Sequence, residues 1–240
     1  MKIFLIAIVI SLGGSLAADS QAQLRDASDG RRRLILGIQA GTSASILRFS
    51  DDCHRVGESI GVQFQERYSP NFHIGGIADA AVTDRIFVRT GLQALSKGWR
   101  GEGTQTDPTT GFRIASTDTF RMYYVQAPLL VSVQRGGSRI GAGLYYGYAF
   151  SAKFSSSSAD TEAFRVDLGD RFEDTYSSSD YGYLLEFGYG VSRNVEVYGQ
   201  LAEGLANQIP RQSVLAAEAR GLALRSRHRA LSFGMSYTFR

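Results

Sequence analysis

The chain has 240 residues, a formal net charge of +3, 27 glycines, 12 tyrosines, 14 phenylalanines and only four prolines. This charge is too small to argue for a nucleic-acid partner, and the glycine and aromatic content favours a strand-rich protein. The single cysteine, Cys53, excludes an intramolecular disulfide, so we expect a partly shielded free thiol, with an intermolecular bridge as the alternative.

The N-terminus has the layout of an export signal. Lys2 precedes the apolar stretch Ile3–Leu12, and small residues lead to Ser20-Gln21-Ala22. The apolar stretch is too short to span a bilayer, so we expect no helical anchor. The predicted domains are a cleavable signal peptide (1–22), a short periplasmic segment (23–33) and an outer-membrane β-barrel (34–240).

From Leu34 onward, apolar and polar residues alternate in runs joined by long polar loops and short turns. In the last run, Ala230–Phe239, every odd position is large and apolar, and every even position is small or a hydroxyl. A sheet can cross the hydrocarbon only if it closes on itself, because lipid offers no partner to a free backbone amide. The pattern therefore predicts an all-β fold, an eight-stranded antiparallel up-and-down transmembrane β-barrel with long extracellular loops and short periplasmic turns.

The predicted strands are 34–42, 72–82, 85–99, 120–133, 139–153, 180–191, 195–206 and 229–239. Short turns are expected at Thr83-Asp84, at Arg135-Gly136-Gly137-Ser138 and at Ser192-Arg193-Asn194. Long loops facing outside the cell are expected near 48–70, 101–118, 155–178 and 208–227, with a short helix within Val214–Leu224.

The alternation also separates two faces of the wall. At eight strands the lumen is about filled by side chains, so inward polar residues should form hydrogen bonds and ion pairs with each other rather than line a pore. The inward-facing polar core is predicted to contain Arg89, Gln93, Lys97, Gln126, Glu186, Glu196 and Gln200. The lipid-facing aromatic belt is predicted to contain Trp99, Tyr123, Tyr146, Tyr148, Phe150, Tyr181, Tyr183, Phe187, Tyr237 and Phe239.

Several segments carry a family resemblance. They are Phe120–Val131 followed by a tight turn and Ile140–Tyr148, together with Leu95–Trp99, Asp180–Gly182 and Phe233–Phe239. With these motifs residues 34–240 resemble the PorT-like outer-membrane β-barrel domain family common in Bacteroidota. The resemblance implies a barrel, a link to secretion machinery in a few members, and no catalytic residues. Arg240 departs from the terminal aromatic of many barrels, but we still expect the barrel-assembly machinery as a partner during insertion.

Residues that could carry chemistry are few. The three histidines, His54, His73 and His228, lack metal-ligand spacing, so we predict neither a metal site nor a cofactor. A weak calcium site is conceivable in an acidic run, although a solvated loop face is favoured: Asp167, Asp170, Glu173 and Asp174. A lipid hydrolase would need His228 with Ser226 or Ser232 at the membrane rim. For His228 we favour a headgroup contact, and we predict no enzyme.

We therefore predict a non-enzymatic integral outer-membrane scaffold whose loops bind a partner, a surface ligand or lipopolysaccharide. The alternatives are a component of a secretion or envelope complex, with an envelope protein as partner, and a narrow channel for small solutes. A soluble periplasmic β-domain is disfavoured, because the apolar stripes would expose far more than the few hundred Å² that soluble monomers tolerate.

Overall fold

The computed structural model describes residues 34–59, 62–106, 113–158, 161–167, 177–209, 211–218 and 220–239. The predicted signal peptide and the segment 23–33 lie outside these residues, and so do Asp170, Glu173 and Asp174 of the acidic run. None of the helices described is long and apolar enough to cross a membrane.

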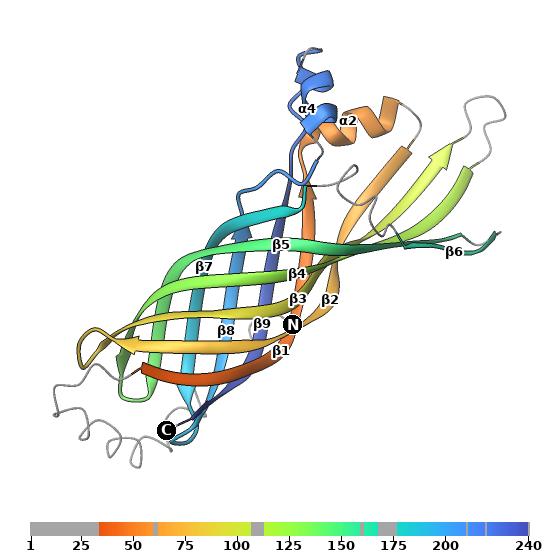
Figure 1. Cartoon of the computed structure of the whole chain (residues 1–240). Helices are drawn as coiled ribbons and strands as arrows, with labels where there is room; N and C mark the ends of the chain where they lie inside the picture. The colour runs from red at the N-terminus through yellow and green to blue at the C-terminus, as the bar shows by residue number, and fades with distance from the viewer. Residues whose placement is uncertain are drawn as a thin grey trace.

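The described residues form nine strands and two helices (Figure 1). The strands are β1 (Leu34–Phe49), β2 (Val62–Ala81), β3 (Ile86–Thr106), β4 (Arg113–Arg135), β5 (Ser138–Ser158), β6 (Thr161–Asp167), β7 (Ser179–Gly190), β8 (Val195–Gly204) and β9 (Ser226–Phe239). The helices are α2 (Asp51–Ser59) and α4 (Arg211–Glu218).

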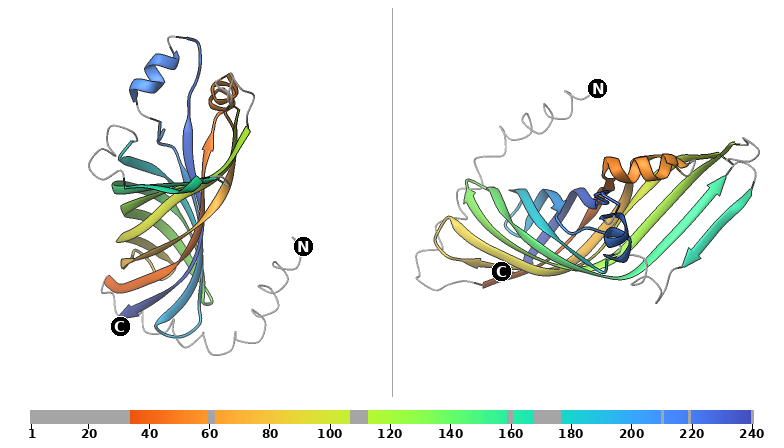
Figure 2. Two further views of the ribbon diagram at one scale, coloured as in Figure 1. Left: turned by 90° about the vertical axis from the view of Figure 1, so that its right-hand side faces the viewer. Right: turned by 90° about the horizontal axis from the view of Figure 1, so that it is seen from above.

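Eight of these strands close into a ring in which every neighbour is antiparallel. β1 pairs with both β2 and β9, so Gly37 lies opposite Ile77 on one side and Thr238 on the other. The ring runs through β2, β3, β4, β5, β7, β8 and β9, while β6 pairs with the outer end of β5 beside the ring. Closure leaves no free edge within the ring, as the hydrocarbon demands. The predicted eight-stranded barrel is confirmed, and Figure 2 shows it from the side and from above.

Tight turns join the strands at one end of the barrel, at the predicted places. Between β4 and β5, Gly136 and Gly137 have φ angles of 57° and 84°. Positive φ at both central residues is the type I′ geometry that matches the twist of an antiparallel hairpin, and it explains the two glycines. Between β2 and β3, the Val82 N–H donates to the Ile86 carbonyl at 2.8 Å.

At the opposite end the strands are longer than predicted. β3 continues to Thr106 and β4 begins at Arg113, so most of the predicted loop 101–118 is strand, and β2 begins at Val62 within the predicted loop 48–70. A barrel strand needs about 9–11 residues to cross the hydrocarbon, whereas β4 has 23. The surplus exceeds what a bilayer requires, and its largely polar composition lacks the sustained apolar alternation that marks a membrane strand.

The outer loops carry further ordered structure. β6 falls within the predicted loop 155–178, and α4 overlaps the predicted helix Val214–Leu224 but begins earlier, at Arg211. The helix α2 was not predicted, and it places Cys53 on a helix rather than in an irregular loop. Asp51 and Asp52 in its first turn favour helix formation, because negative charge there complements the helix dipole.

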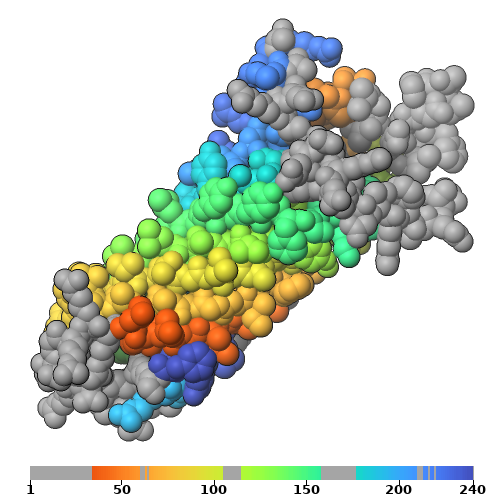
Figure 3. Space-filling model, viewed as in Figure 1, coloured from red at the N-terminus to blue at the C-terminus, as the bar shows by residue number. Residues whose placement is uncertain are grey.

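The outer wall of the barrel is apolar. Figure 3 shows this wall as a continuous surface built from successive strands, from β1 in red to β9 in blue. On β5, Ile140, Leu144 and Phe150 are 66%, 62% and 58% exposed, whereas Tyr145 and Ala149 between them are 3% and 1% exposed. An apolar surface of this kind suits lipid tails and not water. The other exposed members of the predicted belt are Tyr146, Tyr148, Tyr181, Tyr183, Phe187, Tyr237 and Phe239, while Tyr123 is half-buried with its ring 6.5 Å from that of Phe150.

Trp99 is not part of this outer belt, and its assignment to the belt is wrong. Its ring packs on a buried cluster that includes Phe120 and Met122, and it meets Phe49 edge to face at 5.8 Å. Tryptophan is common at membrane interfaces, which suggested the belt. The alternation of β3 nevertheless puts Trp99 on the same side as the buried Lys97, and packing follows the alternation.

Candidate functional site: a polar plug in the lumen

The lumen contains two clusters of buried charged and polar side chains. The turn-side cluster consists of Asp79, Arg89, Arg139, Glu186 and Glu196. The loop-side cluster consists of Lys97, Tyr124, Tyr145, Asp180 and His228. Each side chain reaches the lumen because its position on a strand has the inward parity, and the two clusters therefore draw on strands distant in the sequence.

Arg89 is the centre of the turn-side cluster. Its Nε and Nη2 atoms donate to the two carboxylate oxygens of Asp79, each at 2.7 Å. Its Nη1 atom lies 3.2 Å from Glu186 Oε1 and 3.4 Å from Glu196 Oε1. The paired bonds to Asp79 use the planar fork of the guanidinium, which is the strongest geometry available to an ion pair of this kind.

Arg139 completes the turn-side cluster. Its Nη2 atom lies 2.7 Å from Glu186 Oε1 and also contacts Glu196. Gln200 donates to the second oxygen of Glu186. Three carboxylates thus surround two guanidiniums in a site where the Arg89, Arg139 and Glu186 side chains are 3%, 4% and 1% exposed. Because water does not screen these charges, each depends on its partners.

The loop-side cluster is built on one ion pair. Lys97 Nζ lies 2.7 Å from Asp180 Oδ2, and the two side chains are 4% and 0% exposed. The Tyr145 hydroxyl donates to Asp180 at 3.2 Å. The same ammonium stands 4.2 Å from the centre of the Tyr145 ring and 5.2 Å from that of Tyr124, so cation–π contacts add to the pairing.

His228 belongs to this cluster and not to the membrane rim. It is 1% exposed, and its Nε2 atom lies 3.3 Å from the Tyr124 hydroxyl. The prediction of a headgroup contact is therefore wrong, because the alternation of β9 turns His228 inward together with Ser226. The lipid-facing rim arrangement that a hydrolase would need is accordingly not formed by His228.

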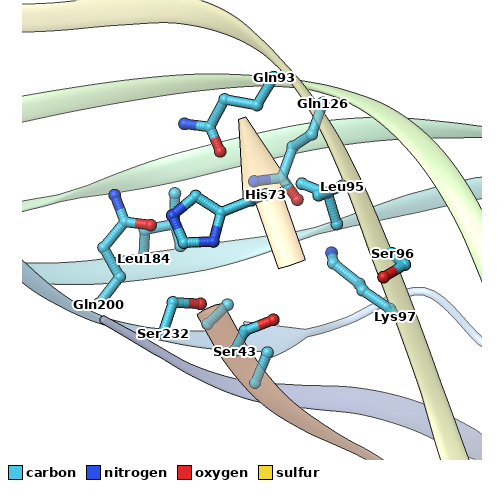
Figure 4. A pocket seen from close by; sticks show the side chains of 12 residues that line it. Ser43, His73, Gln93, Leu95, Ser96, Lys97, Gln126, Leu184, Gln200 and Ser232 are labelled. Atoms are coloured by element: carbon cyan, nitrogen blue, oxygen red, sulfur yellow. The ribbon is translucent and has the colours of Figure 1, made fainter. Parts of the chain in front are cut away.

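A small cavity of about 20 Å³ lies between the clusters. Figure 4 shows His73, Gln93, Gln126 and Gln200 gathered around it from four different strands. His73 is hydrogen-bonded to the Tyr198 hydroxyl, while the buried Oε1 atom of Gln126 has no hydrogen-bond partner among the described residues. The volume and the polar lining suit a single water molecule. The two clusters close the lumen on either side of it.

The inward-facing residues predicted from the sequence all lie in these two clusters or around the cavity between them. Some of them, however, pair with residues that were not predicted to face inward. Arg89 meets Glu186 and Glu196, but Lys97 pairs with Asp180. Gln93, Gln126 and Gln200 line the cavity. Sequence reasoning missed three charged members: Asp79, Arg139 and Asp180. All three stand near strand ends, and extending the alternation to those ends would have identified them.

The described part of the chain contains no group of three or more His, Cys, Asp or Glu side chains arranged to hold a metal ion. The acidic run, for which a solvated loop face was favoured over a weak calcium site, lies outside that part except for Asp167. Cys53 has a free, half-buried thiol whose Sγ lies 3.3 Å from Ser50 Oγ.

The closed ring, its apolar outer wall and its filled polar lumen define an integral outer-membrane β-barrel protein. The sequence matches the outer membrane protein beta-barrel domain family over residues 21–209, and the chain belongs to this family. No match was found among curated proteins.

Several solved structures are similar to the chain in fold. Neisserial surface protein A is 12% identical with a TM-score of 0.45, and the alignment covers 85% of this chain and 97% of that one. The attachment invasion locus protein Ail of Yersinia pestis is 10% identical with a TM-score of 0.41, covering 86% and 99%. The outer membrane protease OmpT of Escherichia coli is 13% identical with a TM-score of 0.36, covering 86% and 96%. These likenesses concern the fold alone.

Proposed function

We propose that this protein is a non-enzymatic scaffold that presents an ordered platform outside the cell for binding. The platform consists of α2 and the segment 220–225 that follows α4, and Figure 1 shows both helices at the end opposite the tight turns. The observation that carries the proposal is that these two loops, distant in the sequence, are joined to each other.

The junction is made by a short set of hydrogen bonds. The Ser50 N–H donates to the Arg225 carbonyl at 2.9 Å, and the Ser50 hydroxyl donates to the Ala223 carbonyl at 2.9 Å. In return, the Ala223 N–H donates to Asp52 Oδ2 at 2.8 Å. The Asn207 side chain binds the same segment, because its Nδ2 atom donates to the Leu224 carbonyl at 2.9 Å. A loop pair fixed in this way offers a partner a preformed surface, which lowers the entropic cost of binding.

The filled lumen supports binding in preference to conduction. A solute passing through would have to break the bonds of Arg89 and then those of Lys97, both of which are buried and paired. Breaking buried ion pairs costs several kcal/mol each. A narrow channel for small solutes is therefore the weaker alternative.

A finer assignment is also proposed. The motifs at Phe120–Val131 and Ile140–Tyr148 support a place among PorT-like barrels of Bacteroidota, and with it a protein of the secretion or envelope machinery as the partner of the platform. This assignment predicts a defined complex, whereas a general surface ligand predicts none.

The test uses the single cysteine as a probe site. A photo-crosslinker attached to Cys53 on intact cells should yield one defined crosslinked species, identified by mass spectrometry. The variant Ser50→Ala/Asp52→Ala removes the side-chain hydrogen bonds of the junction and leaves the backbone bond from Ser50 to Arg225. We call it the unlinked variant, and it should lose the crosslinked species while keeping the heat-shifted band of a folded barrel. Glu58→Gln, an exposed change at the far end of α2, is the matched control.

Two results would contradict the proposal. One is a crosslinking pattern that the unlinked variant leaves unchanged, since the platform would then not be the binding surface. The other is the appearance of discrete conductance steps when the purified protein is placed in a planar bilayer, because a conducting lumen would favour the channel.

A further inference from the structure

Basic residues stand opposite each other on neighbouring strands at the extracellular end of the outer wall. The register places Arg48 opposite Arg227, Arg67 opposite Arg100, and Arg121 opposite Lys153. We call these six residues the basic collar. Like charges directly opposite each other destabilise a sheet unless something neutralises them, so three such pairs in one barrel require an explanation.

The collar faces outward, immediately beyond the apolar wall. Arg121 is the next outward side chain after Tyr123 on β4, and Lys153 lies on β5 just beyond Phe150. On the other side of the barrel, the outward residues of β9 run from Leu231 through Arg229 to Arg227. The level of the collar is therefore that of the lipid headgroups.

The protein neutralises part of this charge itself. Arg67 Nη2 lies 2.7 Å from Glu102 Oε2, and Arg229 pairs with Glu203. Asp167 of β6 occupies the register position beside Lys153. Two carboxylates, Glu102 and Glu203, thus serve two arginines, while the Arg48–Arg227 pair and Arg100 keep their charge exposed at the surface.

Arg121 is held in place for a ligand of defined position. Its cross-strand partner on β3 is Gly98, so no side chain stands between Arg121 and β2, and its Nη2 atom donates to the Pro70 carbonyl at 3.3 Å. A Cβ at position 98 would lie 2.0 Å from the Phe120 carbonyl oxygen, which accounts for the glycine. The guanidinium of Arg121 is thus bound to the backbone of β2 at Pro70.

We propose that the basic collar binds the phosphate groups of a phosphorylated glycolipid of the outer leaflet, whose acyl chains lie on the apolar wall below. Arginine pairs suit phosphate, because each guanidinium can donate two hydrogen bonds to one phosphate. The apolar wall continues directly into the collar, so a ligand that has both phosphates and acyl chains fits better than a soluble anion. This inference goes beyond the platform function and is independent of it.

The experiment measures glycolipid retained by the full-length mature chain. The protein is folded into phosphatidylcholine nanodiscs that contain either bis-phosphorylated lipid A or the same lipid A without phosphates, and bound lipid is counted by native mass spectrometry. We expect the phosphorylated form to be retained about tenfold better, which is the factor that one lost charge-assisted hydrogen bond typically produces.

Variants locate the site. Arg48→Gln/Arg227→Gln and Arg100→Gln/Arg121→Gln should each reduce retention, whereas Arg85→Gln/Arg135→Gln, exposed at the turn end, should not. Equal retention of both lipids by the unaltered protein would overturn the proposal even if no collar variant folds. Equal binding of inorganic phosphate and of lipid A, counted by the same native mass spectrometry, would also overturn it, because the site would then not recognise a lipid.

Discussion

Removing Arg89 is the sharpest test of the turn-side cluster. Three carboxylates face two guanidiniums in this cluster, and Arg89→Leu leaves three carboxylates with Arg139 alone. Breaking a buried ion pair by deleting one partner costs about 3–5 kcal/mol, because the remaining charges stay buried without compensation. We expect the free energy of unfolding to fall by this amount. Urea titration in lipid vesicles measures it, with Trp99, the only tryptophan, as the fluorescent reporter.

A second variant separates charge imbalance from lost packing. Arg89→Leu/Asp79→Leu removes one charge of each sign and restores the original net charge of the cluster, so it should cost less than Arg89→Leu alone. Arg85→Leu, exposed in the nearby turn, should change the free energy by no more than about 0.5 kcal/mol. The reasoning is refuted if Arg89→Leu costs less than about 1 kcal/mol, or if the double variant is the less stable of the two.

Three further predictions concern packing, topology and the closed lumen. Gly143→Ala should lower the free energy of unfolding by about 1–3 kcal/mol, because the new Cβ would lie 2.0 Å from the Leu129 carbonyl oxygen. In the same urea titration Gly76→Ala should be nearly neutral, because the nearest atom to its new Cβ lies at 3.9 Å. A membrane-impermeant maleimide should label Cys53 on intact cells, and labelling only after lysis would reverse the proposed orientation. In planar bilayers Arg89→Ala alone should show no conductance, because Lys97 still closes the loop side of the lumen. The double variant Arg89→Ala/Lys97→Ala should show conductance steps. Steps in the single variant would contradict the idea that each cluster closes the lumen independently.

The membrane-embedded part of the fold could be predicted because lipid imposes a period of two on every strand. Ile140 and Phe150 follow that period, and the strand through them was placed to within a few residues. The strand extensions beyond the membrane length could not be predicted, because their largely polar sequence carries no sustained apolar alternation. Residues Gly101–Thr106 continue β3 although their composition is that of a loop. The helix α2 was missed for a related reason, since nine mostly polar residues carry little apolar periodicity.

For residues near the lumen, the position in the strand alternation predicted which way a side chain faces better than the residue type did. Arg89 and Glu186 were assigned to the interior by alternation, and the structure brings them within 3.2 Å. Trp99 and His228 were assigned to the rim by the habits of their residue types, and both lie inside. The alternation does not predict the stagger between neighbouring strands, and so it does not predict which inward residues meet. The partner of Lys97 proved to be Asp180, and that choice depends on the register of a closed barrel.

The buried charges and the exposed charges of this barrel have different kinds of partner. Inside, Arg89, Arg139 and Lys97 all meet carboxylates, since an unpaired charge in a dry lumen would be too costly to keep. Outside, at the level of the headgroups, Arg48 and Arg227 face each other instead. Such a like-charged pair destabilises the sheet on its own, and a bound anion would remove that repulsion. The buried charges therefore compensate one another inside the barrel, whereas the Arg48–Arg227 pair is the part of the basic collar that the proposed glycolipid phosphate would neutralise.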